Sequence, residues 1–162
     1  MIRCPMCNQF YGVLRGSCPS GTMTISNSHH KLAGHENSRG MWSISYRMES
    51  GTKPENGAQY HGEGRNAYIP MNAEGDEILA LLVIAFERKL VFQVGFSPTR
   101  GVDNVVCWNG IHHKTNTSGG PTSYGYPDET YLARVKDELK QKNVFFDSEE
   151  EKAAGIAKAC KA

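Results

Sequence analysis

The chain has 162 residues, with 18 lysines and arginines against 17 aspartates and glutamates, so its net charge is only +1. This length fits one domain with a substantial core, and the near-neutral charge excludes a broad electrostatic surface for nucleic acid. It leaves room for a small phosphate pocket built from one or two arginines. No run of residues is apolar enough to span a bilayer and the first residues do not form a signal peptide, so we expect no membrane partner.

The five cysteines are odd in number and scattered, which favours reduced thiols and a cytoplasmic or nuclear location. Cys4 and Cys7 form a CxxC pair, but a structural zinc site needs four ligands and no second matched pair follows. Two interpretations stay open. The pair is either two thiols at a frayed terminus or the last two ligands of a zinc module whose remainder lies upstream.

Alternating and β-branched segments predict six strands, at residues 10–14, 22–26, 41–46, 65–70, 90–94 and 105–108. The glycine-rich segment 49–64 is expected to be a long surface loop. Residues 78–86 are apolar on nearly every face and predict a buried helix, with Asn72 as its N-cap.

Residues 128–141 predict an amphipathic helix, with Asp128 as its N-cap after Pro127. One apolar stripe runs along it, through Tyr131, Leu132, Val135 and Leu139. Glu138 lies at the edge of this stripe, and periodicity alone favours a glutamate that simply reaches water. Residues 144–146 predict a short strand, and residues 147–162 a charged, alanine-rich tail that is helical or frayed.

The loop between the last strand and this helix carries indole, imidazole and phenol groups around a glycine-rich turn. Neighbouring side chains usually point to opposite sides, so at most one of His112 and His113 is expected to face a pocket. Packing alone accounts for each of these residues, and for Trp108, Tyr124 and Tyr126, when it is taken singly. Together they indicate a small-ligand pocket.

Two motifs are specific at their spacing: WN-x-IHHKT at residues 108–115 and GYPD at residues 125–128. With weaker matches from residue 11 to about 144, they resemble the Deltex carboxy-terminal domain of the Deltex family of RING-type ubiquitin ligases. The resemblance implies an α+β fold, in which a curved, mainly antiparallel sheet is joined by one buried and one amphipathic helix.

The resemblance also implies a division of the chain. Residues 1–9 resemble the end of a preceding RING, with Cys4 and Cys7 as its last zinc ligands. Zinc would then belong only to a complete RING, and this chain alone is expected to be inactive in ubiquitin transfer. Residues 10–146 would form the domain that binds ADP-ribose or NAD, and residues 147–162 lie outside the resemblance.

In the family, this domain works with a RING and a charged conjugating enzyme to bring ubiquitin to the nucleotide that it binds. The resemblance implies that ubiquitin and a ubiquitin-conjugating enzyme are engaged through the RING. ADP-ribosylated protein or nucleic acid would be a further partner. The expected outcome is conjugation between ubiquitin and ADP-ribose, through either a ribose hydroxyl or the ubiquitin carboxy terminus.

By position, the resemblance gives Glu138 the role of general base on a ribose hydroxyl, with His112 orienting or polarising the same group. The residues expected to bind the nucleotide are Ser97, Trp108, Asn109, His112, Tyr124, Tyr126 and Arg15, the last at the diphosphate. Gly110 stands where the family commonly has glutamate, which could alter substrate preference.

Two alternatives stay open. The first is a non-catalytic reader that recruits ADP-ribosylated proteins or nucleic acids, in which Glu138 would have no chemical role. The second is a scaffold that binds a protein partner through the segment 49–64.

Overall fold

Three antiparallel strands form the central sheet of the computed structural model, which describes residues 2–3, 10–11, 15–53, 55–97 and 100–160. In order across the sheet they are β3 (Gly21–Ser28), β4 (Met41–Met48) and β7 (Gly64–Pro70). Every second side chain of β4 is buried: Trp42, Ile44, Tyr46 and Met48. Because successive strand residues point to opposite faces, one face of the sheet is turned toward the core. The strand predicted at residues 41–46 is confirmed.

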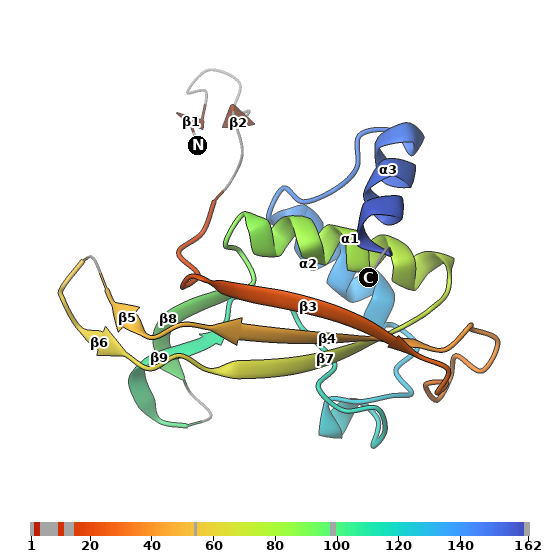
Figure 1. Ribbon diagram of the computed structural model, residues 1–162, viewed down its shortest axis with the longest axis horizontal. Coiled ribbons are helices and arrows are strands. Elements are labelled where there is room, and N and C mark those ends of the chain that lie inside the picture. Colours follow the sequence, from red (N-terminus) through yellow and green to blue (C-terminus); the bar gives the residue numbers. More distant parts are fainter. Residues whose placement is uncertain (1, 4–9, 12–14, 54, 98–99, 161–162) are drawn as a thin grey trace.

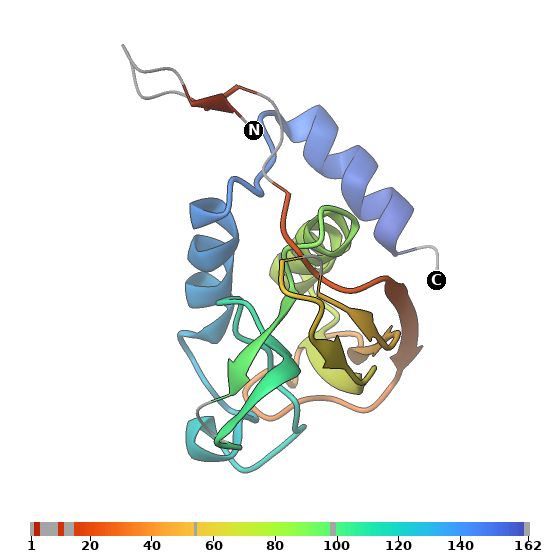
Figure 2. The same cartoon turned by 90° about the vertical axis from the view of Figure 1, so that its left-hand side faces the viewer.

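Helix α1 (Ala73–Glu87) lies along one face of this sheet, as Figure 1 shows. It is capped as predicted, since Asn72 Oδ1 accepts a hydrogen bond of 2.8 Å from the backbone N–H of Gly75. In Figure 2, α2 (Tyr131–Gln141) stands on one side of α1 and α3 (Glu149–Ala159) on the other. Most of α1 is therefore covered, which explains its nearly continuous apolar sequence.

Shorter strand pairs complete the β structure. β8 (Phe92–Ser97) pairs with β9 (Val102–Trp108), and the register is irregular between Gly95 and Ser97. β5 (Gly51–Thr52) pairs with β6 (Gln59–Tyr60), and β1 (Ile2–Arg3) with β2 (Phe10–Tyr11). All strand pairs among the described residues are antiparallel, so the predicted α+β class with a mainly antiparallel sheet is confirmed.

The second predicted helix begins later than its sequence indicates. α2 starts at Tyr131 with Thr130 at the N-cap position, so the prediction of Asp128 as the N-cap is wrong. The carboxylate of Asp128 instead pairs with Lys114 and Arg134. These charged partners hold Asp128 in the turn that precedes the helix.

Other segments also differ from their predictions. Residues 144–146 form no strand, because the backbone N–H of Val144 bonds to the carbonyl of Leu139 at 2.9 Å and closes the end of α2. The predicted loop at 49–64 contains β5 and β6. The tail at 147–162, by contrast, agrees with its prediction as helical or frayed: it contains a third helix, α3, capped by Ser148, which accepts a hydrogen bond of 3.1 Å from the backbone N–H of Glu151. Of the strand predicted at 10–14, residues 12–14 lie outside the described residues.

Candidate functional site

A hollow of about 560 Å³ opens beside the loop that follows β9. It is lined by Arg65, Trp108, Gly110, Ile111, His112, His113, Thr115 and Tyr124. Most of these residues belong to the segment 108–115. The volume lies within the range of small-molecule and cofactor sites, which is roughly 300–1,000 Å³.

Helix α2 holds His112 at three points. The backbone N–H of His112 donates to Glu138 Oε1 at 2.9 Å, and its ring Nδ1 bonds to Glu138 Oε2. Its carbonyl accepts a hydrogen bond of 2.8 Å from the hydroxyl of Tyr131. Tyr131 and Glu138 are about two helical turns apart and so lie on the same side of α2. One face of one helix therefore fixes the position of this histidine.

The two members of this pair differ in exposure. The side chain of His112 is 68% exposed and that of Glu138 is 22% exposed. When Nδ1 of a neutral imidazole donates to a carboxylate, the ring Nε2 is left as an acceptor. The imidazole of His112 lines the hollow, and Glu138 reaches it through that ring. Glu138 therefore has a defined partner, where periodicity alone favoured a purely solvated residue.

His113 forms a buried wall of the same hollow. Its ring stacks on Trp108 with the centroids 4.3 Å apart, and its Nε2 lies 2.8 Å from the hydroxyl of Tyr46. Its Nδ1 lies 2.9 Å from the carbonyl of Ile111. Burial lowers the pKa of His113 to about 4, with the neighbouring His112 adding to this effect and the Ile111 carbonyl opposing it. His113 is therefore neutral at pH 7 and serves as a rigid aromatic wall.

A buried ion pair anchors the loop to the start of α2. The ammonium of Lys114 lies 2.7 Å from Asp128 Oδ2, and both side chains are only 6% exposed. Arg134 pairs with the same carboxylate, and the Lys114 ammonium also lies 5.1 Å from the ring centroid of Tyr131. Burial alone would raise the pKa of Asp128, but the hydrogen bond and charge of Lys114, helped by Arg134, lower it.

Tyr124 stands at the rim of the hollow, with its residue 63% exposed and its backbone in the left-handed region at φ 55°. Gly125 follows it, and a Cβ at that position would lie 2.0 Å from the carbonyl oxygen of Ser118. Only glycine fits this close approach. The glycine-rich turn thus sets the position of the phenol.

The structure places only some of the predicted site residues at this hollow. His112, Trp108 and Tyr124 line it, and Glu138 bonds to His112. The other four predicted ligand-binding residues, Arg15, Ser97, Asn109 and Tyr126, are not among its lining residues. The binding roles of these seven residues, and the catalytic roles of His112 and Glu138, stay predictions.

Most of the residues away from the hollow have other partners. The Asn109 amide donates to the carbonyl of Leu90 at 3.2 Å, and the hydroxyl of buried Tyr126 donates to the carbonyl of Tyr68 at 2.8 Å. Ser97 is buried, and its hydroxyl accepts a long hydrogen bond of 3.4 Å from the backbone N–H of Arg100. Arg15 is exposed.

Arg65 and Thr115 line the hollow without having been singled out from the sequence. Thr115 lies within the specific motif at 108–115, which gave a signal for it. Arg65 occupies the start of a strand that is distant in sequence, and no local pattern marks it as a site residue. Its position becomes visible only once β7 is placed beside β4, where Arg65 pairs with Tyr46.

Gly110 lines the hollow with a positive φ of 81°. A Cβ there would lie in ordinary van der Waals contact with the Lys142 side chain, whose Cε would be its nearest neighbour at 3.6 Å. An acidic residue at this position would therefore lie beside the Lys142 ammonium. The glycine leaves that ammonium without such a neighbour at the edge of the site.

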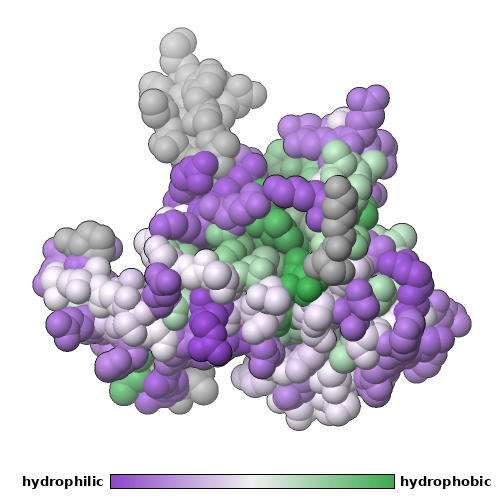
Figure 3. Space-filling model, viewed as in Figure 1, coloured by the Kyte–Doolittle hydropathy of each residue, from purple (hydrophilic) through white to green (hydrophobic). Residues whose placement is uncertain are grey.

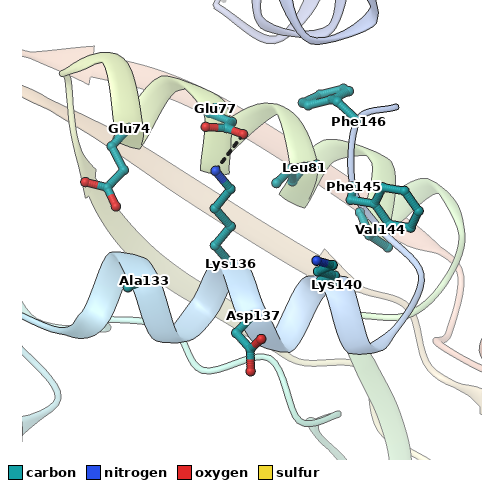
Figure 4. A pocket seen from close by; sticks show the side chains of 10 residues that line it. All are labelled: Glu74, Glu77, Leu81, Ala133, Lys136, Asp137, Lys140, Val144, Phe145 and Phe146. Atoms are coloured by element: carbon teal, nitrogen blue, oxygen red, sulfur yellow. Dashed lines mark ion pairs between the residues drawn. The ribbon is translucent and has the colours of Figure 1, made fainter. Parts of the chain in front are cut away.

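A second groove, of about 470 Å³, lies between α1 and α2 and is shown in Figure 4. Its central carboxylate, Glu77, already pairs with Lys136 at 2.9 Å and with Lys152 at 3.4 Å. A third hollow, of about 310 Å³, lies between β3 and α3, where Figure 3 shows hydrophobic residues gathered. Neither places an imidazole on its wall, so the hollow at His112 is the better candidate for chemistry.

The described residues offer no metal centre, since no group of three or more histidine, cysteine, aspartate or glutamate side chains converges among them. Cys4 and Cys7, predicted as zinc ligands of a complete RING, lie outside the described residues. Within the same described ranges, none of the helices has the length and apolar character needed to cross a bilayer.

The chain belongs to the family of Deltex C-terminal domains, whose family model matches residues 15–144. The resemblance expected from the two motifs is thus confirmed. A human relative named "Probable E3 ubiquitin-protein ligase DTX3" is 42% identical over 149 residues, which cover 89% of this chain and 43% of that protein.

Two further relatives carry similar names. "E3 ubiquitin-protein ligase DTX4" of Mus musculus is 36% identical over 152 residues, covering 91% of this chain and 25% of that protein. "E3 ubiquitin-protein ligase DTX1" of Homo sapiens is 36% identical over 148 residues, covering 88% and 24%. The chain therefore spans less than half the length of these curated relatives.

Proposed function

We propose that this chain is the nucleotide-binding domain of a Deltex-type ubiquitin ligase, which takes ADP-ribose or NAD into the hollow at His112. The observation that carries the proposal is His112, which is bonded to Glu138 and lies on the wall of a hollow of about 560 Å³. The family match and the relatives named as ubiquitin ligases support the assignment to a Deltex-type ligase.

The lining of the hollow suits a nucleotide. Trp108 and Tyr124 offer aromatic surface for a base or ribose, and Thr115 offers a hydroxyl. His113 stacks behind Trp108 and keeps that part of the wall rigid. Positioning of a bound reactant in this way lowers the entropic part of the barrier to its reaction.

In the proposed reaction, a ribose hydroxyl attacks the thioester that joins ubiquitin to a conjugating enzyme. A C–O bond to the ubiquitin carboxy terminus forms, the C–S bond breaks, and the enzyme leaves as a thiolate. The hydroxyl proton passes to the His112–Glu138 pair. The geometry favours His112 Nε2 as its acceptor, because Glu138 already uses both carboxylate oxygens on His112.

This route reverses the two roles implied by the family resemblance, in which Glu138 takes the proton directly. In our proposal Glu138 is a positioning residue that fixes the tautomer and stabilises the imidazolium, as the carboxylate does in a Ser-His-Asp triad. With NAD in place of ADP-ribose, the same hollow would hold the donor for ADP-ribosylation of the ubiquitin carboxy terminus.

Ubiquitin and the conjugating enzyme would be recruited through a RING, which would also hold the zinc. An ADP-ribosylated protein or nucleic acid would supply the nucleotide. Cys18, Cys107 and Cys160 are free thiols, which supports a reducing compartment such as the cytoplasm or nucleus.

Binding is tested by calorimetric titration of ADP-ribose into the chain, with NAD and AMP as comparators. We expect ADP-ribose and NAD to bind, and AMP to bind more weakly because it fills less of the hollow. Absence of heat with all three ligands, together with no competition against a labelled ADP-ribose, would refute the proposal.

Catalysis is tested in a fusion of the chain to the RING of a relative, using Glu138→Ala and His112→Ala. The control is Asp137→Ala, which removes the neighbouring carboxylate on α2, a lining residue of the other groove. Loss of a general base typically slows a reaction by about 10²–10⁴-fold. We expect both site variants to lose transfer by this order while the control keeps it.

The variants also separate the two chemical routes and the non-catalytic reader. If Glu138 were the direct base, His112→Ala would retain much of the transfer rate when ADP-ribose is saturating. A reader without chemistry would show no transfer in the wild-type fusion, although ADP-ribose binds.

A further inference from the structure

Arg65 is the charged side chain on the wall of the hollow. Its strand, β7, pairs with β4 so that Arg65 lies opposite Tyr46, the residue that bonds to His113. No carboxylate stands among the described residues that line the hollow, and His113 is neutral at pH 7. The wall of the hollow therefore carries a guanidinium and no carboxylate of its own, which favours an anionic ligand.

The partner of Arg65 is shared with a second arginine. Glu63 pairs with Arg65 and, at 2.6 Å, with Arg100, so this cluster of one carboxylate and two guanidinium groups has a net positive charge. Burial alone would raise the pKa of Glu63, but the hydrogen bonds and charges of Arg100 and Arg65 lower it, so the carboxylate stays ionised at neutral pH. Half of the Arg100 side chain is exposed, whereas Arg65 is 27% exposed.

The guanidinium of Arg65 is oriented but not saturated. Its Nη1 donates to the carbonyl of Gly64 at 2.9 Å, and its Nη2 pairs with Glu63. An arginine has five N–H donors in a rigid fork. Among the described residues, the Gly64 carbonyl and Glu63 are the partners that the Arg65 donors have. The remaining donors are available for a ligand in the hollow, and such a fork matches the oxygen spacing of a phosphate.

We propose that Arg65 recognises the diphosphate of the nucleotide and gives the hollow its preference for ADP-ribose over uncharged nucleosides. The inference deepens the proposed function and rests on it. It also replaces Arg15, which the sequence offered as the diphosphate contact and which does not line the hollow. Arg65 is a binding residue in this proposal and takes no part in moving the proton.

A purely structural role for Arg65 would consist of its ion pair with Glu63. Arg100 provides the matched control, because it pairs with the same carboxylate and is not among the residues that line the hollow. Arg65→Gln removes an ion pair and a cation at the hollow, whereas Arg100→Gln removes an ion pair alone. Arg65→Lys keeps the charge and loses the fork.

The experiment titrates ADP-ribose, adenosine and inorganic pyrophosphate into the whole chain and its three variants, with thermal melts to confirm folding. Hydrogen bonds to charged groups predict that Arg65→Gln weakens ADP-ribose binding by about ten- to hundred-fold. Adenosine should bind to this variant as it binds to wild type. Arg100→Gln should match wild type with every ligand, and Arg65→Lys should fall between wild type and Arg65→Gln.

Two outcomes would overturn the inference although ADP-ribose binds. In the first, Arg65→Gln binds ADP-ribose as tightly as Arg100→Gln does. In the second, Arg65→Gln loses adenosine and ADP-ribose binding equally, as expected of a structural role. Pyrophosphate separates this inference from the proposed function. Pyrophosphate binding that depends on Arg65, without any binding of ADP-ribose, would refute the proposed function and leave anion recognition standing. Binding of neither ligand would refute both.

Discussion

Acid should destabilise this fold through His113, and replacing that histidine should remove the effect. The pKa of His113 is lowered from its ordinary 6.5 to about 4 by burial against Trp108 and Tyr46. The unfolded chain therefore binds the proton more tightly than the folded one. The stability linked to this residue is fully present above pH 6.5 and is lost progressively as the pH falls toward 4.

The size of the loss follows from the two pKa values. The full difference corresponds to about 3 kcal/mol, and about 2 kcal/mol of it should be lost between pH 7.5 and pH 5.0. For a chain of 162 residues, a change of this size lowers the melting temperature by about 4–8 °C.

The assay compares thermal unfolding of wild type, His113→Gln and His61→Gln at the two pH values. His61 is exposed, so its replacement controls for the loss of any one histidine. His113→Gln should be less stable than wild type at pH 7.5, but it should lose about 2 kcal/mol less on acidification. A pH slope equal to that of wild type would show that the reasoning about His113 is mistaken.

Two further substitutions test the supports of the site. Lys114→Met leaves Asp128 buried without its main partner and should lower the free energy of unfolding by about 3 kcal/mol in urea titrations at pH 7.5. A loss below about 1 kcal/mol would contradict a buried role for this pair. Gly125→Ala forces a Cβ against the Ser118 carbonyl and should cost about 1–3 kcal/mol. It should also weaken ADP-ribose binding by displacing Tyr124, and unchanged affinity would remove Tyr124 from the proposed site.

Local patterns in the sequence were sufficient for the main elements. The alternation in residues 41–46 marks a strand because one face is buried, and the apolar run at 78–86 marks a helix covered on most sides. The cap at Asn72 could be predicted because it depends on a contact only three residues away. Such features involve interactions within one element, which periodicity and capping rules describe directly.

The site depends on contacts that these rules do not describe. Glu138 meets His112 across 26 residues, and periodicity could place Glu138 only at the edge of an apolar stripe. Asp128 looks like an N-cap locally, yet a charge 14 residues earlier determines its role. Arg65 has no local signal because its place at the hollow depends on how strands pair. The motifs identified the family, whereas the convergence of side chains required the fold.

The bonds between α2 and His112 hold the imidazole in place independently of the loop that follows it. Hydrogen bonds with Tyr131 and Glu138 attach the backbone of His112 to a helix, and Glu138 also bonds to its imidazole, while residues 116–124 belong to a turn that makes none of these bonds. Insertions or exchanges in that turn can therefore remodel the rim without moving the ring. A scaffold built this way can diversify what it admits while His112, the proposed proton acceptor, keeps its place.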